Sequence, residues 1–218
     1  MDAARIRTYK RRAGRMTHTQ THALQEHRQR IHVPQDFMPW PWEGAPLPIL
    51  EIGFGMGEAT LELAARAPGI QHLAIDVHTP GIGNLLAGIE KHGLTNLTVI
   101  EGDADEFLRD IVPSISLEGV RLFFPDPWPK ARHHKRRFVT VERLTLVAER
   151  IRAGGFLHIA TDWQDYAEQS RSSLAATGCW HLVANTEHAD PHSRPLTRFE
   201  RRGRDAGRAI HDIVAVRT

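Results

Sequence analysis

An aspartate held between two prolines is the first place in the chain where chemistry is expected. Asp126 lies within Phe-Phe-Pro-Asp-Pro-Trp-Pro-Lys, residues 123–130, and a basic run continues to Arg137. Proline fixes its own φ and pushes the residue before it toward extended backbone, so Asp126 is expected on a stiff loop. A rigid acid beside aromatic rings and cations suits a flat, anionic substrate. The alternative is a proline-rich turn with an exposed acid.

The cations that follow this aspartate are close together in sequence. They are Lys130, Arg132, Lys135, Arg136 and Arg137. Cations at the start of a helix oppose its dipole, so phosphate binding is favoured over a solvated helix start. A second basic block spans residues 194–204. Trp128, between Asp126 and the cations, either stacks on a base or packs within the protein.

A glycine-rich turn follows the first apolar run of the chain. Glu51 is followed by Gly53, Gly55 and Gly57, and such glycines allow a tight turn and a close approach of backbone to a ligand. The third glycine comes one position too early for the dinucleotide fingerprint G-x-G-x-x-G. A carboxylate directly before the glycines would repel phosphates, so the turn suits a cationic ligand.

Two more acids end the next two predicted strands. Asp76 is placed to bind the hydroxyls of a ribose, and Asp103 lies where an adenine could bind. Each has the alternative of a surface acid or a helix cap, and capping is a strong alternative for Asp103. Three acids at three successive strand ends together indicate adenosine that carries a positive group, which is S-adenosylmethionine.

Strands and helices alternate from residue 47 onward. The predicted strands cover residues 47–52, 71–77, 97–101, 120–124, 156–160, 180–184 and 209–216. The predicted helices cover residues 59–67, 82–92, 104–112, 138–152 and 166–176. This alternation predicts an α/β fold with a mostly parallel, doubly wound, Rossmann-like sheet. Ligands bind such sheets beyond the carboxyl ends of the strands, where these acids fall.

The N-terminal segment carries an excess of positive charge. Residues 1–30 hold eight Lys/Arg and two acids, a net charge of +6, whereas the whole 218-residue chain has only +2. Apolar residues are too few there to form a core face, so we expect a mobile arm that binds RNA phosphates. A solvated tail is the alternative. The expected contacts are Arg7, Lys10, Arg11, Arg12 and Arg15.

Composition limits the kind of protein and its organisation. A hydrophobic fraction of 41% and a charged fraction of 25% are typical of a soluble globular protein. We expect a basic arm over residues 1–32, a Pro/Trp-rich linker over 33–46 and one domain over 47–218. The single cysteine cannot form an internal disulfide, and no Cys/His/Asp grouping has metal-ligand spacing, so no metal is expected.

The start of the chain has no long apolar run, so neither a signal peptide nor a membrane span is expected, and the cytoplasm is the expected location. An organellar transit peptide is a minor alternative for the Arg-rich start.

Several motifs together resemble one enzyme family. They are residues 51–57 (Glu-Ile-Gly-Phe-Gly-Met-Gly), 77–81, the block from 123 to 137, 160–163 (Ala-Thr-Asp-Trp) and 197–200 (Thr-Arg-Phe-Glu). They strongly resemble the bacterial tRNA (guanine-N7-)-methyltransferases. The resemblance implies a class I methyltransferase sheet whose last strand is antiparallel. It also implies methyl transfer from S-adenosylmethionine to guanine N7 at position 46 of the tRNA variable loop, which forms 7-methylguanosine.

The same resemblance implies roles for individual residues. Cofactor-site positions are matched by Glu51, Asp76, Asp103 and Asp126, and Asp126 also matches the proposed catalytic position. Substrate-binding positions are matched by Lys130, Asp162, Thr197, Arg198, Phe199 and Glu200. Many members of the family carry glutamate where this chain has Asp76. The shorter acid is still expected to reach a ribose.

The chemistry of guanine indicates what Asp126 would do. N7 carries a lone pair and no proton, so the enzyme need not remove a proton before attack. Its main work is alignment of the reactants, which can contribute roughly 7–11 kcal/mol. Asp126 would stabilise the developing positive charge and hold the N1–H and amino edge of the base.

Other functions stay open at this point. One is methylation of an exocyclic amine of adenine or cytosine, and another is a non-catalytic RNA-binding protein with a methyltransferase fold. A nicotinamide dehydrogenase is disfavoured by the glycine spacing. The expected partner is tRNA, without DNA or membrane, and the expected state is a monomer or homodimer.

Overall fold

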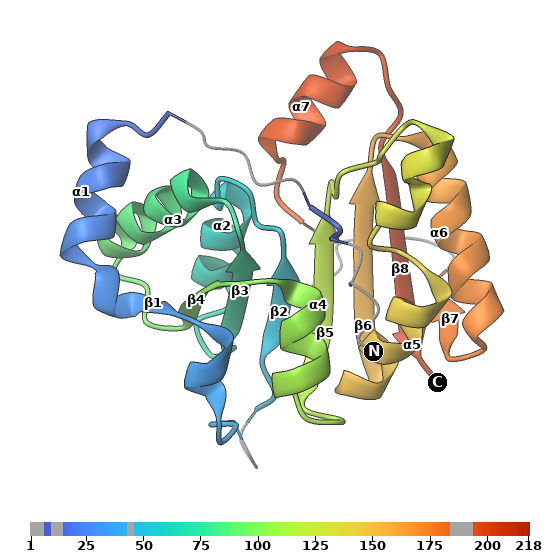
Figure 1. Ribbon diagram of the computed structural model, residues 1–218, viewed down its shortest axis with the longest axis horizontal. Coiled ribbons are helices and arrows are strands. Elements are labelled where there is room, and N and C mark those ends of the chain that lie inside the picture. The colour runs from blue at the N-terminus through green and yellow to red at the C-terminus, as the bar shows by residue number, and fades with distance from the viewer. Residues whose placement is uncertain (1–6, 10–14, 43–45, 184–193) are drawn as a thin grey trace.

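The structure is a computed structural model that describes residues 7–9, 15–42, 46–183 and 194–218. A single sheet runs through its centre, with helices packed against it (Figure 1). Its strands are β1 (Ile31–His32), β2 (Ile49–Ile52), β3 (His72–Asp76), β4 (Leu97–Glu101), β5 (Leu117–Phe123), β6 (Ile151–Thr161), β7 (Trp180–Leu182) and β8 (His211–Arg217).

The strand order across the sheet is β1-β4-β3-β2-β5-β6-β8-β7. β8 runs antiparallel to β6 and β7, and the remaining pairings are parallel. The predicted mostly parallel sheet with an antiparallel last strand is therefore confirmed. Because β2, β3 and β5 are parallel neighbours, their carboxyl ends meet at one edge of the sheet.

Helices follow most of the strands. They are α1 (His18–Glu26), α2 (Glu58–Arg66), α3 (Thr79–His92), α4 (Ala104–Glu106), α5 (Val141–Arg150), α6 (Gln164–Thr177) and α7 (Arg198–Asp205). Short 3-10 helices cover Arg28–Arg30, Pro34–Phe37 and Ala131–Arg136, and α4 continues as a π-helical segment over Phe107–Ile111.

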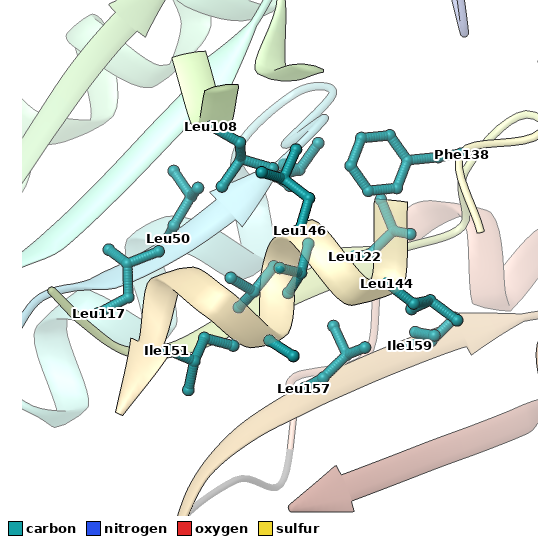
Figure 2. Packing of buried hydrophobic residues seen from close by; sticks show 14 of the residues in the cluster. Leu50, Leu108, Leu117, Leu122, Phe138, Leu144, Leu146, Ile151, Leu157 and Ile159 are labelled. Atoms are coloured by element: carbon teal, nitrogen blue, oxygen red, sulfur yellow. The ribbon is translucent and has the colours of Figure 1, made fainter. Parts of the chain in front are cut away.

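Two hydrophobic clusters cover the two faces of the sheet. In β3, Leu73 and Ile75 pack in the cluster that contains residues of α5 and α6, whereas Ala74 between them packs in the cluster of α2 and α3. This alternation follows from the two-residue period of a strand. Figure 2 shows part of the first cluster, in which Leu144 and Leu146 of α5 and Leu157 and Ile159 of β6 are labelled. Helices on both faces leave the strand ends as the accessible edge.

Residues 18–32 form elements that the sequence reasoning did not predict. Thr17 and Gln20 form a capping box at the start of α1, each side chain accepting a hydrogen bond from the other's backbone N–H. α1 packs on α3, where a Cβ on Gly83 would lie 2.7 Å from the Gln20 carbonyl oxygen. Ala23 is buried, so the expectation of no core-facing side does not hold for α1.

Residues 34–42, expected as a linker lying over the domain, place aromatic side chains in the core. Phe37 and Trp40 are buried, and their rings lie 5.6 and 6.2 Å from the ring of Phe107. Pro34 begins a 3-10 helix, which proline allows at the first position because that N–H has no partner within the helix. The proline content indicated irregular backbone but not this packing.

The helix predicted over residues 138–152 is shorter in the structure. Thr140 caps α5 by accepting a hydrogen bond from the Arg143 N–H, and β6 already begins at Ile151. Within the described ranges, no helix is long and apolar enough to cross a bilayer. The same ranges contain no group of three or more His, Cys, Asp or Glu side chains arranged to hold a metal ion.

Candidate active site at the carboxyl ends of the strands

A cavity of about 330 Å³ opens at the carboxyl ends of β2, β3 and β5. It is lined by the glycine turn after β2, by residues 76–78 after β3, by the Asp126 loop after β5 and by the start of α7. Figure 1 shows α7 at the top of the view, over the ends toward which β5 and β6 point. Thr8 and Tyr9 of the N-terminal segment also line the cavity.

The glycine turn has backbone geometry that favours glycine. Gly53, Gly55 and Gly57 have φ of 71°, 59° and 76°, in the left-handed region that side chains disfavour. At Gly57 an added Cβ would also lie 2.7 Å from Leu85. The start of α3 approaches the turn very closely, since a Cβ on Gly81 would overlap the Gly55 carbonyl oxygen. The turn is therefore held in a single shape against α3.

Glu51 lies at the end of β2 and lines the cavity, although it is only 5% exposed. Burial raises its pKa to about 7, and the nearby Arg121 acts in the opposite direction. A positively charged group placed beside this carboxyl group would favour its ionised form, so the site suits a cationic ligand. The structure places this acid in the cavity, and its contact with a ligand stays a prediction.

Asp76 is held by backbone donors on both sides. Its Oδ2 accepts from the Gly55 N–H at 2.8 Å, and its Oδ1 accepts from the N–H groups of Val77 and His78 at 2.7 and 2.9 Å. Burial raises the pKa of Asp76, and these hydrogen bonds oppose the rise. The carboxylate therefore connects the glycine turn to β3 and still lines the cavity.

Asp103 caps a helix, which is the strong alternative predicted for this residue from the sequence. Its Oδ1 accepts from the Asp105 N–H at 2.8 Å, which caps α4. Gly102 and Ala104 line the cavity, but Asp103 is not among the described residues that do so. Its assignment to the cofactor stays a prediction.

The Asp126 loop is strained on both sides of the aspartate. Phe124 has φ of 51° and Trp128 has φ of 44°, which are rare for bulky residues and occur where surrounding contacts enforce them. Asp126 is exposed and lines the cavity. The stiff loop predicted from the prolines is thus also constrained by its non-proline residues.

Arg137 provides one of those constraints. Its side chain is 1% exposed, and its Nε donates to the Pro127 carbonyl oxygen at 2.8 Å. The other guanidinium nitrogens donate to Gln169 and Asp165 of α6, and the guanidinium lies 4.9 Å from the ring centre of Tyr166. The assignment of Arg137 to RNA is therefore corrected, because this buried cation ties the Asp126 loop to α6.

Trp128 packs within the protein rather than presenting a free face. Its indole Nε1 donates to the Thr8 carbonyl oxygen at 3.1 Å, and the Arg136 guanidinium lies 4.7 Å from its ring centre. The ring of His133 meets it edge-on at 5.9 Å. The packing alternative for Trp128 is the one the structure supports.

The remaining cations of the run differ in exposure. Lys130, Arg132 and Lys135 are exposed, and Arg136 is half-buried. Arg7 and Arg15 of the N-terminal segment are also exposed, whereas Lys10, Arg11 and Arg12 lie outside the described residues.

The four residues of the Thr-Arg-Phe-Glu block point to two different environments. Thr197, Arg198 and Phe199 line the cavity, and the Phe199 ring is near-parallel to that of Phe124, with centroids 6.4 Å apart. Thr197 caps α7 by accepting from the Glu200 N–H at 3.0 Å. Glu200 is 3% exposed, is paired with Arg194 and Arg204, and is not among the described lining residues.

Asp162 is likewise engaged inside the protein. Its Oδ2 accepts from Arg208 Nε at 2.7 Å, which joins the end of β6 to the segment after α7. Asp162 and Glu200 therefore position α7 in this structure, and direct contact of either with a substrate stays a prediction.

Sequence reasoning missed several residues of the cavity. Phe124, Met56 and His78 lie within the quoted motifs, yet they had no assigned role, and Arg202 lay in the second basic block. Their signal was their position next to strand ends. Tyr9 carried no such signal, because its place in the cavity depends on how the N-terminal segment crosses the molecule.

The fold and this cavity define a class I methyltransferase. A family model described as "Putative methyltransferase" matches residues 46–213. The 16S rRNA (adenine(1408)-N(1))-methyltransferase from Catenulisporales acidiphilia has a similar fold, with a TM-score of 0.53, 16% identity and coverage of 85% of this chain and 91% of that one. Precorrin-6y C5,15-methyltransferase from Geobacter metallireducens matches with a TM-score of 0.52 and 17% identity, over 78% and 80% of the chains.

Relatives with a named activity identify the family within this class of methyltransferases. The tRNA (guanine-N(7)-)-methyltransferase of Nitrosomonas eutropha is 46% identical over 96% of this chain and 95% of its own. That of Burkholderia vietnamiensis is 45% identical over 96% and 84%. This chain belongs to the tRNA (guanine-N(7)-)-methyltransferase family, as the motif resemblance implied.

Proposed function

We propose that this protein methylates N7 of a guanine in tRNA with S-adenosylmethionine as the methyl donor, forming 7-methylguanosine, and that the guanine is at position 46 of the variable loop. One observation carries this proposal most directly. The cavity combines a buried carboxylate and a glycine turn on one side with a rigid, exposed Asp126 and a basic surface on the other. The relatives named above carry the same activity in their names.

The residues present fit S-adenosylmethionine. Glu51 and Asp76 bring two carboxyl groups to the cavity, and the glycine turn provides backbone without side chains beside them. Glu51 would bind the positively charged end of the cofactor, and Asp76 would bind the ribose hydroxyls. When bound, the cofactor supplies a methyl group that its positively charged sulfur has already activated.

Asp126 orients and stabilises the guanine in this proposal. Guanine N7 needs no deprotonation, so a carboxylate at this place acts by position and charge rather than as a base. Asp126 would accept hydrogen bonds from N1–H and the amino group of the base and stabilise the positive charge that develops on it. The strained backbone at Phe124 and Trp128 holds the carboxylate ready before the base arrives.

The tRNA would be bound by the exposed cations around the cavity. Lys130, Arg132 and Lys135 lie next to Asp126 in the chain, and Arg198 and Arg202 of α7 line the opening. Cations in this arrangement bind the phosphate backbone and position the RNA without reading its sequence. The target base must leave any stacked arrangement to enter the cavity. We also infer a cytoplasmic location, where tRNA is found, and a monomer or homodimer.

Transfer of a labelled methyl group to unmodified tRNA transcripts tests the proposal. We expect label on a transcript that carries guanine at position 46 and none on its adenine-46 counterpart, and we expect 7-methylguanosine after digestion to nucleosides. Label on an exocyclic amine of adenine or cytosine would replace the proposal with the alternative chemistry. Binding of tRNA without any transfer, together with no binding of S-adenosylmethionine, would indicate a non-catalytic RNA-binding protein.

A further inference from the structure

A buried arginine lies directly beside the acid at the first strand end. Arg121 of β5 and Glu51 of β2 are register partners on neighbouring parallel strands, and they are 3% and 5% exposed. Register partners on paired strands project from the same face, and the strands lie about 4.8 Å apart. Only Glu51 of the two lines the cavity. Arg121 therefore lies behind Glu51, away from any ligand.

The guanidinium of Arg121 has few polar contacts for a buried cation. Its Nη1 lies 3.3 Å from Nδ1 of His72, and its Nε has no hydrogen-bond partner among the described residues. Phe156 lies on another side, with the guanidinium carbon 5.8 Å from its ring centre. Burial and the Arg121 charge lower the pKa of His72 to about 4, so His72 is neutral. An imidazole supplies no negative charge in either protonation state, so the charge of Arg121 is balanced elsewhere.

Glu51 is the acid that stabilises the Arg121 cation. Burial lowers the pKa of Arg121, and the negative charge of Glu51 raises it. The groups that act on Glu51 come from three elements: Arg121 of β5, Thr60 of α2 and Asp76 of β3. Arg121 and Thr60 favour the ionised carboxylate, whereas the charge of Asp76 disfavours it. Among the described residues, Arg121 is thus the cation that opposes the effect of burial on the pKa of Glu51.

We propose that Arg121 is a positioning residue that increases the ionised fraction of Glu51 near neutral pH, so that the cavity binds the positively charged end of S-adenosylmethionine. This inference rests on the proposed function, because it assumes that Glu51 binds the cofactor. The cofactor's positive end and Arg121 would lie on opposite sides of one carboxylate. Before the cofactor arrives, Arg121 is the larger of the two influences that favour the ionised carboxylate, and Thr60 is the smaller.

The consequence is a dependence of cofactor affinity on pH that Arg121 controls. Without Arg121, the pKa of Glu51 rises further, so more of the carboxyl group is protonated near neutral pH. A shift of one pKa unit changes the ionised fraction by up to about tenfold. At high pH the carboxyl group ionises in both proteins, and the difference between them disappears.

Calorimetric titration of full-length wild-type and Arg121→Met protein with S-adenosylmethionine, from pH 6 to pH 9, tests this inference. We expect the ratio of the Kd of the variant to that of wild type to be about five- to tenfold at pH 6.5 and to approach 1 at pH 9. The ratio removes titration of the ligand itself, which is common to both proteins. Titration of the Glu51 carboxyl by ¹³C NMR in the ligand-free proteins should show the higher pKa in Arg121→Met.

Two controls separate charge from structure. 5′-Methylthioadenosine lacks the amino-acid part and the positive sulfur, so its Kd should be equal in both proteins at every pH. Arg121→Lys keeps a cation and should fall closer to wild type than Arg121→Met. A ratio of 1 throughout, or equal weakening of both ligands at all pH values, would overturn the inference.

A further control covers the case in which Arg121→Met does not fold. If Arg121→Met does not fold, the double variant Arg121→Met/Glu51→Gln removes both charges and should fold, because a buried pair can be replaced at little cost whereas an unpaired charge cannot. Failure of the double variant to fold would overturn the inferred electrostatic coupling between Arg121 and Glu51. Absence of S-adenosylmethionine binding by wild-type protein would instead contradict the proposed function.

Discussion

The side of the cavity that we propose for the cofactor and the side that we propose for the substrate, called here the cofactor side and the substrate side, are built differently. On the cofactor side, Glu51 and Asp76 belong to paired strands, and their positions follow from the register of the sheet. On the substrate side, Asp126 lies on a loop and Phe199 on α7, outside the sheet. A few internal ion pairs hold those segments in place, chiefly those of Arg137 and Arg194. The substrate side should therefore be the more sensitive to changes in charged residues that never contact a ligand.

Asp126→Asn should give the largest effect on catalysis. Asparagine keeps the shape of the side chain but removes the negative charge that we assign to stabilising the methylated guanine. Loss of one positioned electrostatic group lowers kcat by about 10²–10³, or about 2.7–4 kcal/mol. The rate of methyl transfer to a tRNA transcript under single-turnover conditions measures this loss.

Asp36→Asn is the matched control for this substitution. Asp36 accepts from the Val33 N–H at 2.9 Å and is not among the described residues that line the cavity, so its variant should retain kcat. Near-normal turnover by Asp126→Asn with intact tRNA binding would exclude the electrostatic role.

Arg137→Met should show that the substrate side depends on a buried cation. The variant loses the hydrogen bonds to Pro127, Gln169 and Asp165, and hydrogen bonds of charged groups contribute about 1.5–3 kcal/mol each. Contributions of bonds that share one guanidinium do not add, and the exposed Asp165 is solvated once it is unpaired, so we expect a loss of roughly 2–3 kcal/mol in the free energy of unfolding, measured by urea denaturation. We also expect a lower kcat, because the Asp126 loop is released, with the Kd for S-adenosylmethionine unchanged. Equal weakening of cofactor binding would show that the two sides are not independent.

The same comparison explains what the sequence could predict. Strand alternation and glycine spacing placed Glu51 and Asp76 at neighbouring strand ends, because in a parallel sheet those ends meet. Arg136 and Arg137 are adjacent in one basic run, yet one lies over Trp128 and the other is buried against α6. No local pattern distinguishes them, since burial of a cation depends on partners about 30 residues away.

The sequence reasoning did not predict the helices α1 and α7, for another reason. α1 buries only Gln20 and Ala23, and α7 buries only Glu200 and Gly203, so neither has an apolar stripe. α7 is instead held by the Thr197 cap, by Glu200 pairs and by close contact of Gly203 with Asp162. Interactions of this kind depend on the tertiary fold, and hydrophobic periodicity does not reveal them.

Thr197→Ala should give a smaller effect, again on the substrate side. Loss of the N-cap hydroxyl lowers helix stability by about 1 kcal/mol, and the start of α7 carries Arg198 and Phe199 into the cavity. We expect the KM for tRNA to rise several-fold while the Kd for S-adenosylmethionine stays constant. Thr197→Ser keeps the hydroxyl and should behave as wild type. Equal KM values for tRNA in Thr197→Ala and Thr197→Ser would mean that the cap does not position α7 for the substrate.

Arg132→Ala should have the smallest effect. It tests an exposed cation of the same basic run that contains the buried Arg137. Arg132 is exposed, so its removal should leave the free energy of unfolding nearly unchanged, in contrast to Arg137→Met. If it binds one phosphate, the slope of log Kd for tRNA against log salt should fall by about 0.7–0.9. Lys91→Ala, an exposed cation at the end of α3, is the control and should not change the slope. Equal slopes for all three proteins would remove Arg132 from the tRNA surface.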